Sequence, residues 1–248
     1  MRSFIINADD CGMSVYVNAC IEEGINLGKI SSTTIIANMH DFDGAIRLYK
    51  SYGDRVSFGW HINLDEGEPL TRSQLLLDKG FFIEHDDKLL LNGGAFRHAF
   101  FNKEMREAIK IELRKQWEKI KDSGVDITHA DGHHYIHSQP SMVQIIPFLF
   151  DELGIDRCRH VANYGIKGIS GIARSTWAFY FKTKGIRMPD TFCAFSDYYN
   201  HPNLSQGSTI ELMCHPGHHS EEYKIEFELV KTIDVRNWGG DLISYKSI

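Results

Sequence analysis

The chain has 248 residues, of which 42% are hydrophobic and 24% are charged, and its formal net charge is −6. This balance argues against the basic surface of a nucleic-acid-binding protein and the polybasic patch of a membrane-surface protein. The apolar runs are too short for a transmembrane span, and the N-terminal residues lack the apolar region and cleavage site of a signal peptide. We therefore expect no nucleic-acid partner, no membrane partner and no secretion signal.

The cysteines are five in number, widely spaced and without a CxxC pair. An odd number at such spacings predicts neither a disulfide framework nor a thiolate zinc site. Since free cysteines are typical of a reducing compartment, we expect a cytoplasmic protein.

Short apolar strands alternate with amphipathic helices along the first part of the chain. Strands are predicted over residues 3–7, 33–39 and 56–64, where β-branched and aromatic residues gather. Helices are predicted over 17–28 and 43–53, because each segment has helical spacing and ends at a glycine.

A segment without strong periodicity follows, from residue 65 to residue 101. Loops of this length are often lids or binding loops. The segment contains Phe81, Phe82, Phe96, Phe100 and Phe101. These rings either contact a ligand or form a small core beneath the loop.

The pattern of strands and helices resumes at a helix over 102–124, which Asn102 can cap. A strand is predicted over 125–131 and a helix over 141–154, where Pro147 should kink the helix or mark its first turn. Three further strands and two helices complete the pattern, over residues 157–162, 191–195, 208–214, 171–185 and 221–235.

Alternating strands and helices imply a parallel sheet covered by helices, in the α/β class. We expect an irregular TIM-like (β/α) barrel forming a single domain over residues 1–248, with an open doubly wound sheet as the alternative. The barrel is favoured because polar residues occur at the ends of several strands, and such ends meet at one mouth of a barrel.

These polar residues lie in four places. Asp9 and Asp10 follow the first strand, and His61 lies in the third. The stretch THADGHHYIH, residues 128–137, covers the end of the fourth strand and the loop after it, and His215 follows the strand that ends in ELMC. If the barrel forms, these side chains lie together.

Imidazole and carboxylate groups together bind divalent metals such as zinc, cobalt or manganese. One carboxylate of an Asp-Asp pair can bind the metal while the other accepts a proton from bound water, and a histidine opposite can protonate a leaving group. Each feature alone has a structural explanation, as a turn, a buried core histidine or an exposed Pro-Gly loop. The density of histidines in residues 128–137 favours a metal or catalytic role.

Five motifs occur in order along the chain: NADDCGMS, SSTTIIANM, GWHINLDEGEPL, THADGHHYIH and ELMCHPGH. They resemble those of the YdjC-like carbohydrate deacetylases, which include the chitooligosaccharide deacetylases. The resemblance implies an irregular (β/α) barrel that holds one divalent metal ion, magnesium or zinc. It also implies a hydrolase that removes the acetyl group from an N-acetylated amino sugar or oligosaccharide and releases acetate.

Carried over position by position, the resemblance implies that Asp10, His61 and His133 bind the metal. It implies that Asp9 is the general base and that His215 is the general acid or stabilises the transition state. The stretch also contains residues that we expect to support the ligands or to line the substrate, namely His129, Asp131, His134 and His137. The chain departs from the usual motifs at Cys11, Ala130 and Gly132. These departures spare the ionisable residues of the metal site but change the shape expected for the pocket.

Other activities remain open from the residues alone. Two histidines and a carboxylate also form the site of non-haem iron oxygenases. Another metal-dependent barrel hydrolase, such as a phosphoesterase, or a carbohydrate-binding protein without turnover would have a similar pocket. The sequence also leaves open whether the protein forms a homodimer.

Overall fold

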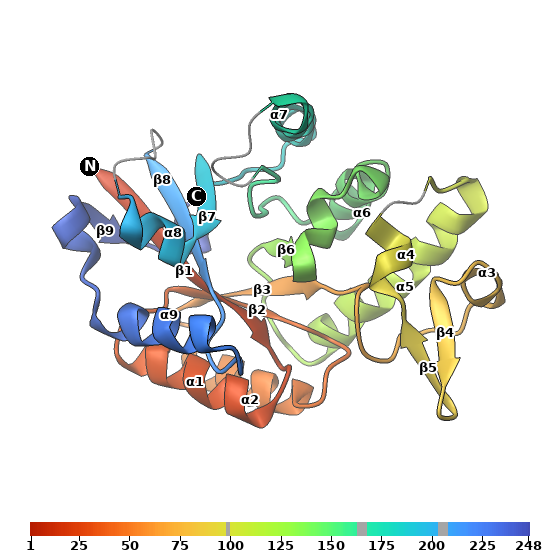
Figure 1. Cartoon of the computed structure of the whole chain (residues 1–248), viewed down its shortest axis with the longest axis horizontal. Coiled ribbons are helices and arrows are strands. Elements are labelled where there is room, and N and C mark those ends of the chain that lie inside the picture. Colours follow the sequence, from red (N-terminus) through yellow and green to blue (C-terminus); the bar gives the residue numbers. More distant parts are fainter. Residues whose placement is uncertain (98–99, 163–167, 203–207) are drawn as a thin grey trace.

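The computed structural model of the chain describes residues 1–97, 100–162, 168–202 and 208–248. Its centre is a parallel sheet with the strand order β6-β3-β2-β1-β8-β7, and β9 pairs with β1 (Figure 1). The strands of this sheet are β1 (Arg2–Cys11), β2 (Ser32–Ile35), β3 (Ser57–Ile62), β6 (Ala130–Gly132), β7 (Thr191–Ala194), β8 (Thr209–Cys214) and β9 (Gly240–Leu242).

The sheet is curled into a half-barrel around the central strand β1. One edge of β1 pairs with β8 from Ser3 to Ala8, and the other edge pairs first with β9 and then with β2. Beyond β6, two isolated bridges continue the pairing in the described part of the chain, from Ala130 to Cys158 and from Arg157 to Arg187. The α/β class and the parallel sheet are thus confirmed.

Helices α1 (Val15–Asn26), α2 (Phe42–Tyr52) and α9 (Glu221–Thr232) lie together on one side of the sheet in Figure 1. Among the described residues the longest helix is α5 (Lys103–Asp122), which begins where expected, since the side chain of Asn102 accepts a hydrogen bond from the backbone of Met105 at 2.8 Å. Apolar residues every three or four positions of α5 are buried, so the predicted face packs inward.

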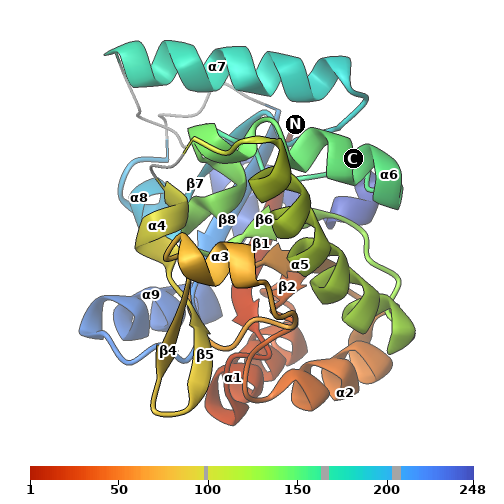
Figure 2. The ribbon, with the colours of Figure 1, turned by 90° about the vertical axis from the view of Figure 1, so that its right-hand side faces the viewer.

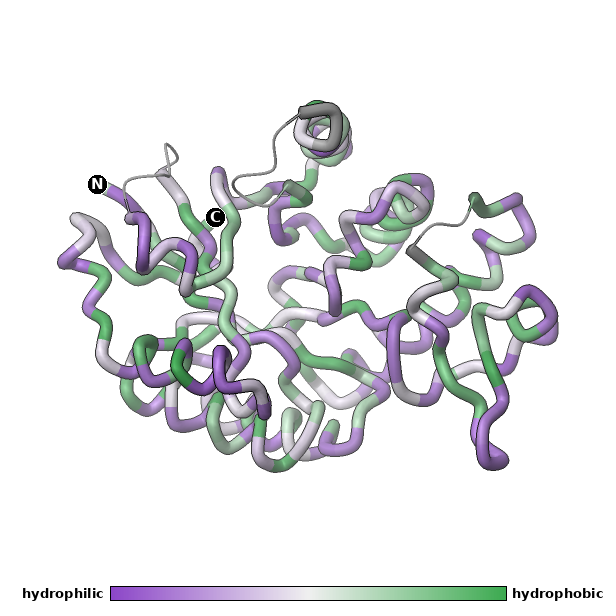
Figure 3. The backbone as a smooth tube through the Cα atoms, viewed as in Figure 1, coloured by the Kyte–Doolittle hydropathy of each residue, from purple (hydrophilic) through white to green (hydrophobic). Residues whose placement is uncertain are grey.

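The segment 65–101 forms small elements of its own: α3 (Gln74–Asp78), a hairpin of β4 (Phe82–His85) and β5 (Lys88–Leu91), and α4 (Gly93–Arg97). The hairpin stands beneath α3 and α4 in Figure 2, and its tip is hydrophilic in Figure 3. Phe81, Phe96 and Phe101 contact one another at 4.9 to 6.4 Å between ring centroids. These rings are buried and form a small core, whereas Phe100 is exposed.

Several predicted elements are shorter than expected, among them the strand predicted over 33–39, which is limited to β2 and ends at Ile35. The strand predicted over 125–131 is limited to β6, and the strand predicted over 157–162 is reduced to the two bridges. The helix predicted over 141–154 begins only at α6 (Ile146–Leu153), with Pro147 in its first turn, because proline lacks the N–H that a helix interior requires. The remaining elements are α7 (Gly168–Thr183), α8 (Phe195–Asn200) and the 3₁₀ turns η1 (His133–Ser138), η2 (Pro140–Met142), η3 (Val235–Trp238) and η4 (Tyr245–Ser247).

Among the described residues, no helix combines the length and the apolar character that crossing a bilayer demands. All five cysteines are buried and unpaired.

Candidate active site

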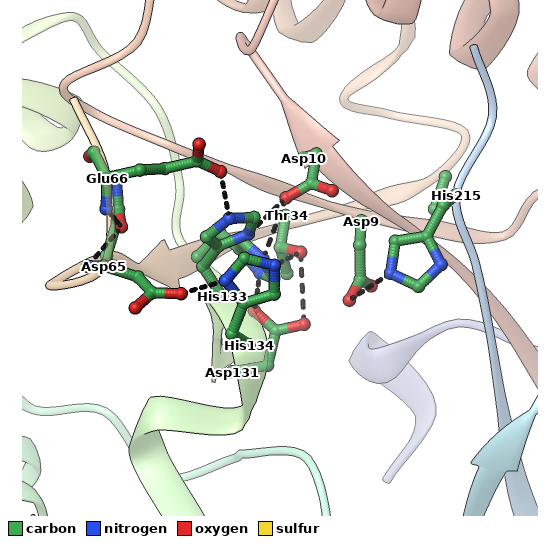
Figure 4. Close-up of polar contacts among 12 residues, drawn as sticks. Asp9, Asp10, Thr34, Asp65, Glu66, Asp131, His133, His134 and His215 are labelled. Carbon is green, nitrogen blue, oxygen red and sulfur yellow. Dashed lines mark hydrogen bonds and ion pairs between the residues drawn. The ribbon is translucent and has the colours of Figure 1, made fainter. Parts of the chain in front are cut away.

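Two aspartates lie just before the last residue of strand β1, and their side chains both reach one site. Side chains alternate between the faces of a regular strand, so Asp9 and Asp10 would ordinarily point in opposite directions. Asp10 instead has a φ of 68°, and the pairing with β2 changes register between Ala8 and Cys11. A bulge of this kind redirects side chains and is common beside active sites. Both carboxylates are consequently buried, and both take part in the contacts of Figure 4.

Asp10 lies between two of the predicted histidines. Its Oδ1 atom is 3.2 Å from Nε2 of His61 on β3 and 2.8 Å from Nδ1 of His133, the first residue of η1. The three side chains are buried, and one ligand atom from each lies within 4.8 Å of the others. The structure therefore brings together the three residues that were predicted from the sequence as metal ligands.

The geometry of this trio fits a divalent cation. Two atoms that coordinate one ion at about 2.1 Å lie about 3.0 Å apart at a right angle and about 3.4 Å apart at a tetrahedral angle, and the contacts of Asp10 Oδ1, at 3.2 and 2.8 Å, are close to this spacing. This buried oxygen has no aligned hydrogen bond within the described structure, so the two imidazoles approach it without satisfying it. One carboxylate oxygen and two imidazole nitrogens are also donors that zinc and similar metals accept.

Each histidine of the trio has a carboxylate at its other nitrogen. Asp131 Oδ1 is 2.6 Å from Nδ1 of His61, and Glu66 Oε1 is 2.6 Å from Nε2 of His133. Such partners orient a ligating imidazole and select its tautomer. Asp131 was expected to support the site. Glu66 was not predicted, because nothing in the sequence around a glutamate in a loop indicates that it contacts a histidine far along the chain.

Burial disfavours the charged form of these groups, but their neighbours outweigh it. Asp131 and Asp10 raise the pKa of His61 to about 10, and Asp10 and Glu66 raise the pKa of His133 to about 9. The adjacent imidazoles likewise hold the pKa of Asp10 well below its ordinary value. A cation bound here would compete with protons for the imidazole nitrogens.

Asp9 is held by a buried arginine that the sequence analysis missed. Arg159 donates from Nη1 to Asp9 Oδ2 at 2.8 Å and from Nη2 to Asp9 Oδ1 at 2.6 Å. Its Nη2 is also 2.9 Å from Asp131 Oδ2. Burial raises the pKa of Asp9, but the guanidinium overcomes this effect and lowers the pKa to about 2. Asp9 is therefore ionised at neutral pH.

His215 faces Asp9 from the end of β8 (Figure 4), with 4.0 Å between its Nε2 and Asp9 Oδ2. Its backbone N–H donates to Oε1 of Glu226 on α9 at 3.1 Å. Burial lowers the pKa of the His215 imidazole, although Asp9 and Asp10 act in the opposite direction. The imidazole is thus neutral at neutral pH.

His218, three residues after His215, contacts the other oxygen of Asp10, with 2.8 Å between Nε2 and Oδ2. The ring of Tyr223 lies 4.5 Å from that of His215 and 5.5 Å from that of His218. The motif CHPGHH had indicated that histidines gather after β8, but their spacing alone did not show that His218, rather than its neighbours, contacts Asp10.

The other three histidines of residues 128–137 have different surroundings, although the ring of His134 lies 4.0 Å from that of His133 between centroids. His134 is half exposed and contacts Asp65. His137 is buried, and neither ring nitrogen has a partner within the described residues. His129 is buried behind the site, where it stacks on Tyr245 at 3.7 Å between ring centroids.

Two other sets of side chains in the described ranges also bring three ligand atoms within 4.8 Å. They are Asp9, His61 and Asp131, and Asp65, His133 and His134. Arg159 already supplies a cation to the two carboxylates of the first set, and the second set includes the half-exposed His134. The trio around Asp10 is therefore the strongest candidate for a metal centre.

Known proteins are similar to this chain over most of its length. A profile of the family described as "YdjC-like protein" matches residues 3–241. A carbohydrate deacetylase of Clostridium beijerinckii is 30% identical over 216 residues, which cover 86% of this chain and 81% of the relative. A chitooligosaccharide deacetylase of Escherichia fergusonii is 29% identical over 218 residues, or 87% of this chain and 81% of the relative.

The fold is also similar to a crystal structure of a candidate cellobiose-phosphate cleavage protein from Enterococcus faecalis V583. The TM-score is 0.77, and the match covers 99% of this chain and 98% of the other at 18% identity. At this identity the likeness concerns the fold alone.

Proposed function

Since the chain belongs to the YdjC-like family, we propose that it is a metal-dependent carbohydrate deacetylase. It would hydrolyse the acetamide of an N-acetylated amino sugar or oligosaccharide, such as a chitooligosaccharide, and release acetate. Relatives that share most of their length with this chain are named carbohydrate deacetylase and chitooligosaccharide deacetylase, which supports the proposal.

Asp10, His61 and His133 would hold one divalent cation, which supplies Lewis-acid polarisation of the acetamide carbonyl and acidifies water. The donor set of one carboxylate and two imidazoles favours zinc over magnesium, which prefers oxygen ligands. Asp131 and Glu66 would keep the two imidazoles in the required orientation.

Asp9 would accept the proton from the water that attacks the acetyl carbon. Its low pKa keeps the carboxylate ionised, and acidification of the water by the cation would let this weak base accept the proton. Arg159 binds both of its oxygens, so the carboxylate is held in one direction, and a fixed orientation lowers the entropic cost of proton transfer.

His215 would deliver a proton to the nitrogen that leaves as the carbon–nitrogen bond breaks. Because the imidazole is neutral in the resting protein, the proton that Asp9 removes from water would pass to His215, whose Nε2 is 4.0 Å from Asp9 Oδ2. The products would be acetate and a free amino sugar, and the proton taken from water would end on the amine.

The observation that carries this proposal is the buried Asp10–His61–His133 trio directly beside the Asp9–His215 pair. The test is acetate release from a panel of N-acetylated mono- and oligosaccharides by chelated protein to which zinc, magnesium, manganese or cobalt is returned. We expect equimolar acetate and free amine, highest with zinc.

Three results would contradict the proposal. Phosphate release from phosphate esters, without acetate release, would assign the site to a phosphoesterase. Binding of the sugars without turnover under any metal would indicate a binding protein. An oxygen requirement would point to an iron oxygenase instead.

We further propose that the deacetylase unit spans residues 1–248 as a single irregular TIM-like barrel. The bridges from Ala130 to Cys158 and from Arg157 to Arg187 support this closure, since they continue the pairing beyond β6. The five buried, unpaired cysteines support a cytoplasmic location.

A further inference from the structure

A line of buried polar contacts leads from Asp9 into the interior of the half-barrel. Arg159, which holds Asp9, also donates from Nε to Oε1 of Glu211 on β8 at 2.8 Å. The hydroxyl of Tyr245, in η4, donates to Oε2 of the same carboxylate at 2.5 Å. Arg159, Glu211 and Tyr245 are each fully buried.

The guanidinium of Arg159 is fixed by these carboxylates. Its two terminal nitrogens bind Asp9 and Asp131, and its Nε donates to Glu211. The guanidinium also lies over the ring of Phe192, 4.7 Å from its centroid. Because the group is planar, the contact at Nε determines how both terminal nitrogens meet Asp9.

The position of Glu211 depends in turn on Tyr245. The tyrosine ring is stacked on His129 with 7° between the ring planes. His129 is itself held by the hydroxyls of Ser32 and Thr128, at 3.2 and 2.8 Å from its two nitrogens. The hydroxyl of Tyr245 therefore has a fixed place from which to bind Glu211.

A contribution to stability does not explain this arrangement well. Removing several charges from water offsets most of what they gain by attracting one another, and apolar residues of similar size often serve a core equally well. The other residues of β8 from Ile210 to Cys214 are apolar, so Glu211 is the exception in a buried strand.

We propose that Glu211 and Tyr245 are positioning residues for the reaction. They orient Arg159 and, through Arg159, hold Asp9 in the direction from which it accepts a proton. This inference rests on the proposed deacetylase activity.

The first test is Tyr245→Phe, which removes the hydroxyl and keeps the ring on His129. Tyr52→Phe is the matched control, because the Tyr52 hydroxyl also donates to a glutamate, Glu22, at 2.8 Å, but on the outer helices. We expect kcat for acetate release to fall roughly tenfold in Tyr245→Phe, with KM within about twofold of wild type. The control should keep wild-type kcat.

The second variant, Glu211→Gln, preserves the shape of the side chain and removes its charge. We expect its kcat to fall between about 10-fold and 100-fold. If the residues act as one line, the double variant should lose no more than Glu211→Gln alone, a non-additivity that two independent structural defects would not produce. Zinc affinity, measured by calorimetry, should stay unchanged in all variants, and kcat is normalised to the folded fraction from circular dichroism.

The outcomes separate the two proposals. If wild type releases no acetate from any sugar, the proposed function fails. If wild type is active and both variants keep its kcat, or change only KM, the positioning role is overturned. Additive losses in the double variant would also overturn it.

Discussion

Arg159 donates to both carboxylate oxygens of Asp9, at 2.8 and 2.6 Å, and both side chains are buried. Bidentate pairs of this kind fix geometry as well as charge. Asp9 is therefore set apart from its neighbour Asp10, whose Oδ1 lies between the imidazoles of His61 and His133. Two adjacent residues thus have different partners and, in the proposed reaction, different tasks.

Asp9→Asn tests the task of Asp9. The amide cannot accept the proton, so kcat for acetate release should fall by about 10²–10⁴. Zinc binding should persist, because Asp10, His61 and His133 remain. Asp54→Asn, at an exposed position, serves as the control. Wild-type turnover by Asp9→Asn would remove Asp9 from the role of base.

Asp10→Asn tests the metal centre. Asparagine tolerates the left-handed backbone at this position, so the change mainly removes the charge and weakens a ligand. Affinity for zinc, measured by calorimetry on chelated protein, should fall more than about 100-fold, since loss of outer partners alone costs about 10–100-fold. Zinc should raise the Tm of wild type much more than that of the variant.

Asp86→Asn is the matched control for this experiment. Asp86 also has a positive φ, of 49°, but its side chain is exposed in the β4–β5 hairpin. It should bind zinc like wild type. Equal zinc affinity in Asp10→Asn and Asp86→Asn would contradict the assignment of the metal to Asp10.

Glu226 predicts a specific dependence of stability on pH. Burial raises its pKa from 4.5 to about 7, so the folded protein binds this proton more tightly than the unfolded chain does. Its contribution to stability is therefore present below about pH 4.5 and is lost as the pH rises through about 7. Glu226→Gln should show a smaller decline of Tm over this range than wild type, in the presence of a chelator.

The exposed Glu222 lies on the same helix, and Glu222→Gln controls for the loss of one negative charge. Its Tm should follow the wild-type curve across the range. Parallel curves for wild type and Glu226→Gln would show that Glu226 does not take up a proton on folding.

Gly59 leaves the space that His129 occupies. A Cβ atom on Gly59 would lie 2.6 to 2.8 Å from three atoms of the His129 ring, which is buried and stacked on Tyr245. Gly59→Ala should therefore lower the free energy of unfolding by about 1–3 kcal/mol. Denaturant unfolding measures it, with Gly94→Ala as a control at an uncrowded helical position.

The double variant Gly59→Ala with His129→Ala identifies the cause. Removing the ring removes the clash, so the combined loss should be smaller than the sum of the two single losses. Strictly additive losses would mean that the strain lies elsewhere.

Local sequence was sufficient for most of the helices and strands. The cap at Asn102 and the inward face of α5 follow from spacing, because a helix brings every third or fourth residue to one side. The small core of Phe81, Phe96 and Phe101 shows the limit of such reasoning, since aromatic residues in a long segment are equally consistent with a ligand surface and with a core.

The sequence by itself predicted that Asp9, Asp10, His61, His133 and His215 lie close together, because parallel strands end at the same edge and the motifs occur in the order of a known family. Only the tertiary structure decided their partners. Arg159 lies 150 positions from Asp9, and Tyr245 lies 34 positions from Glu211. The bulge at Asp10 and the burial of Arg159 depend on the register and packing of strands that are distant in the sequence. The residue type at a single position does not indicate either the register or the packing.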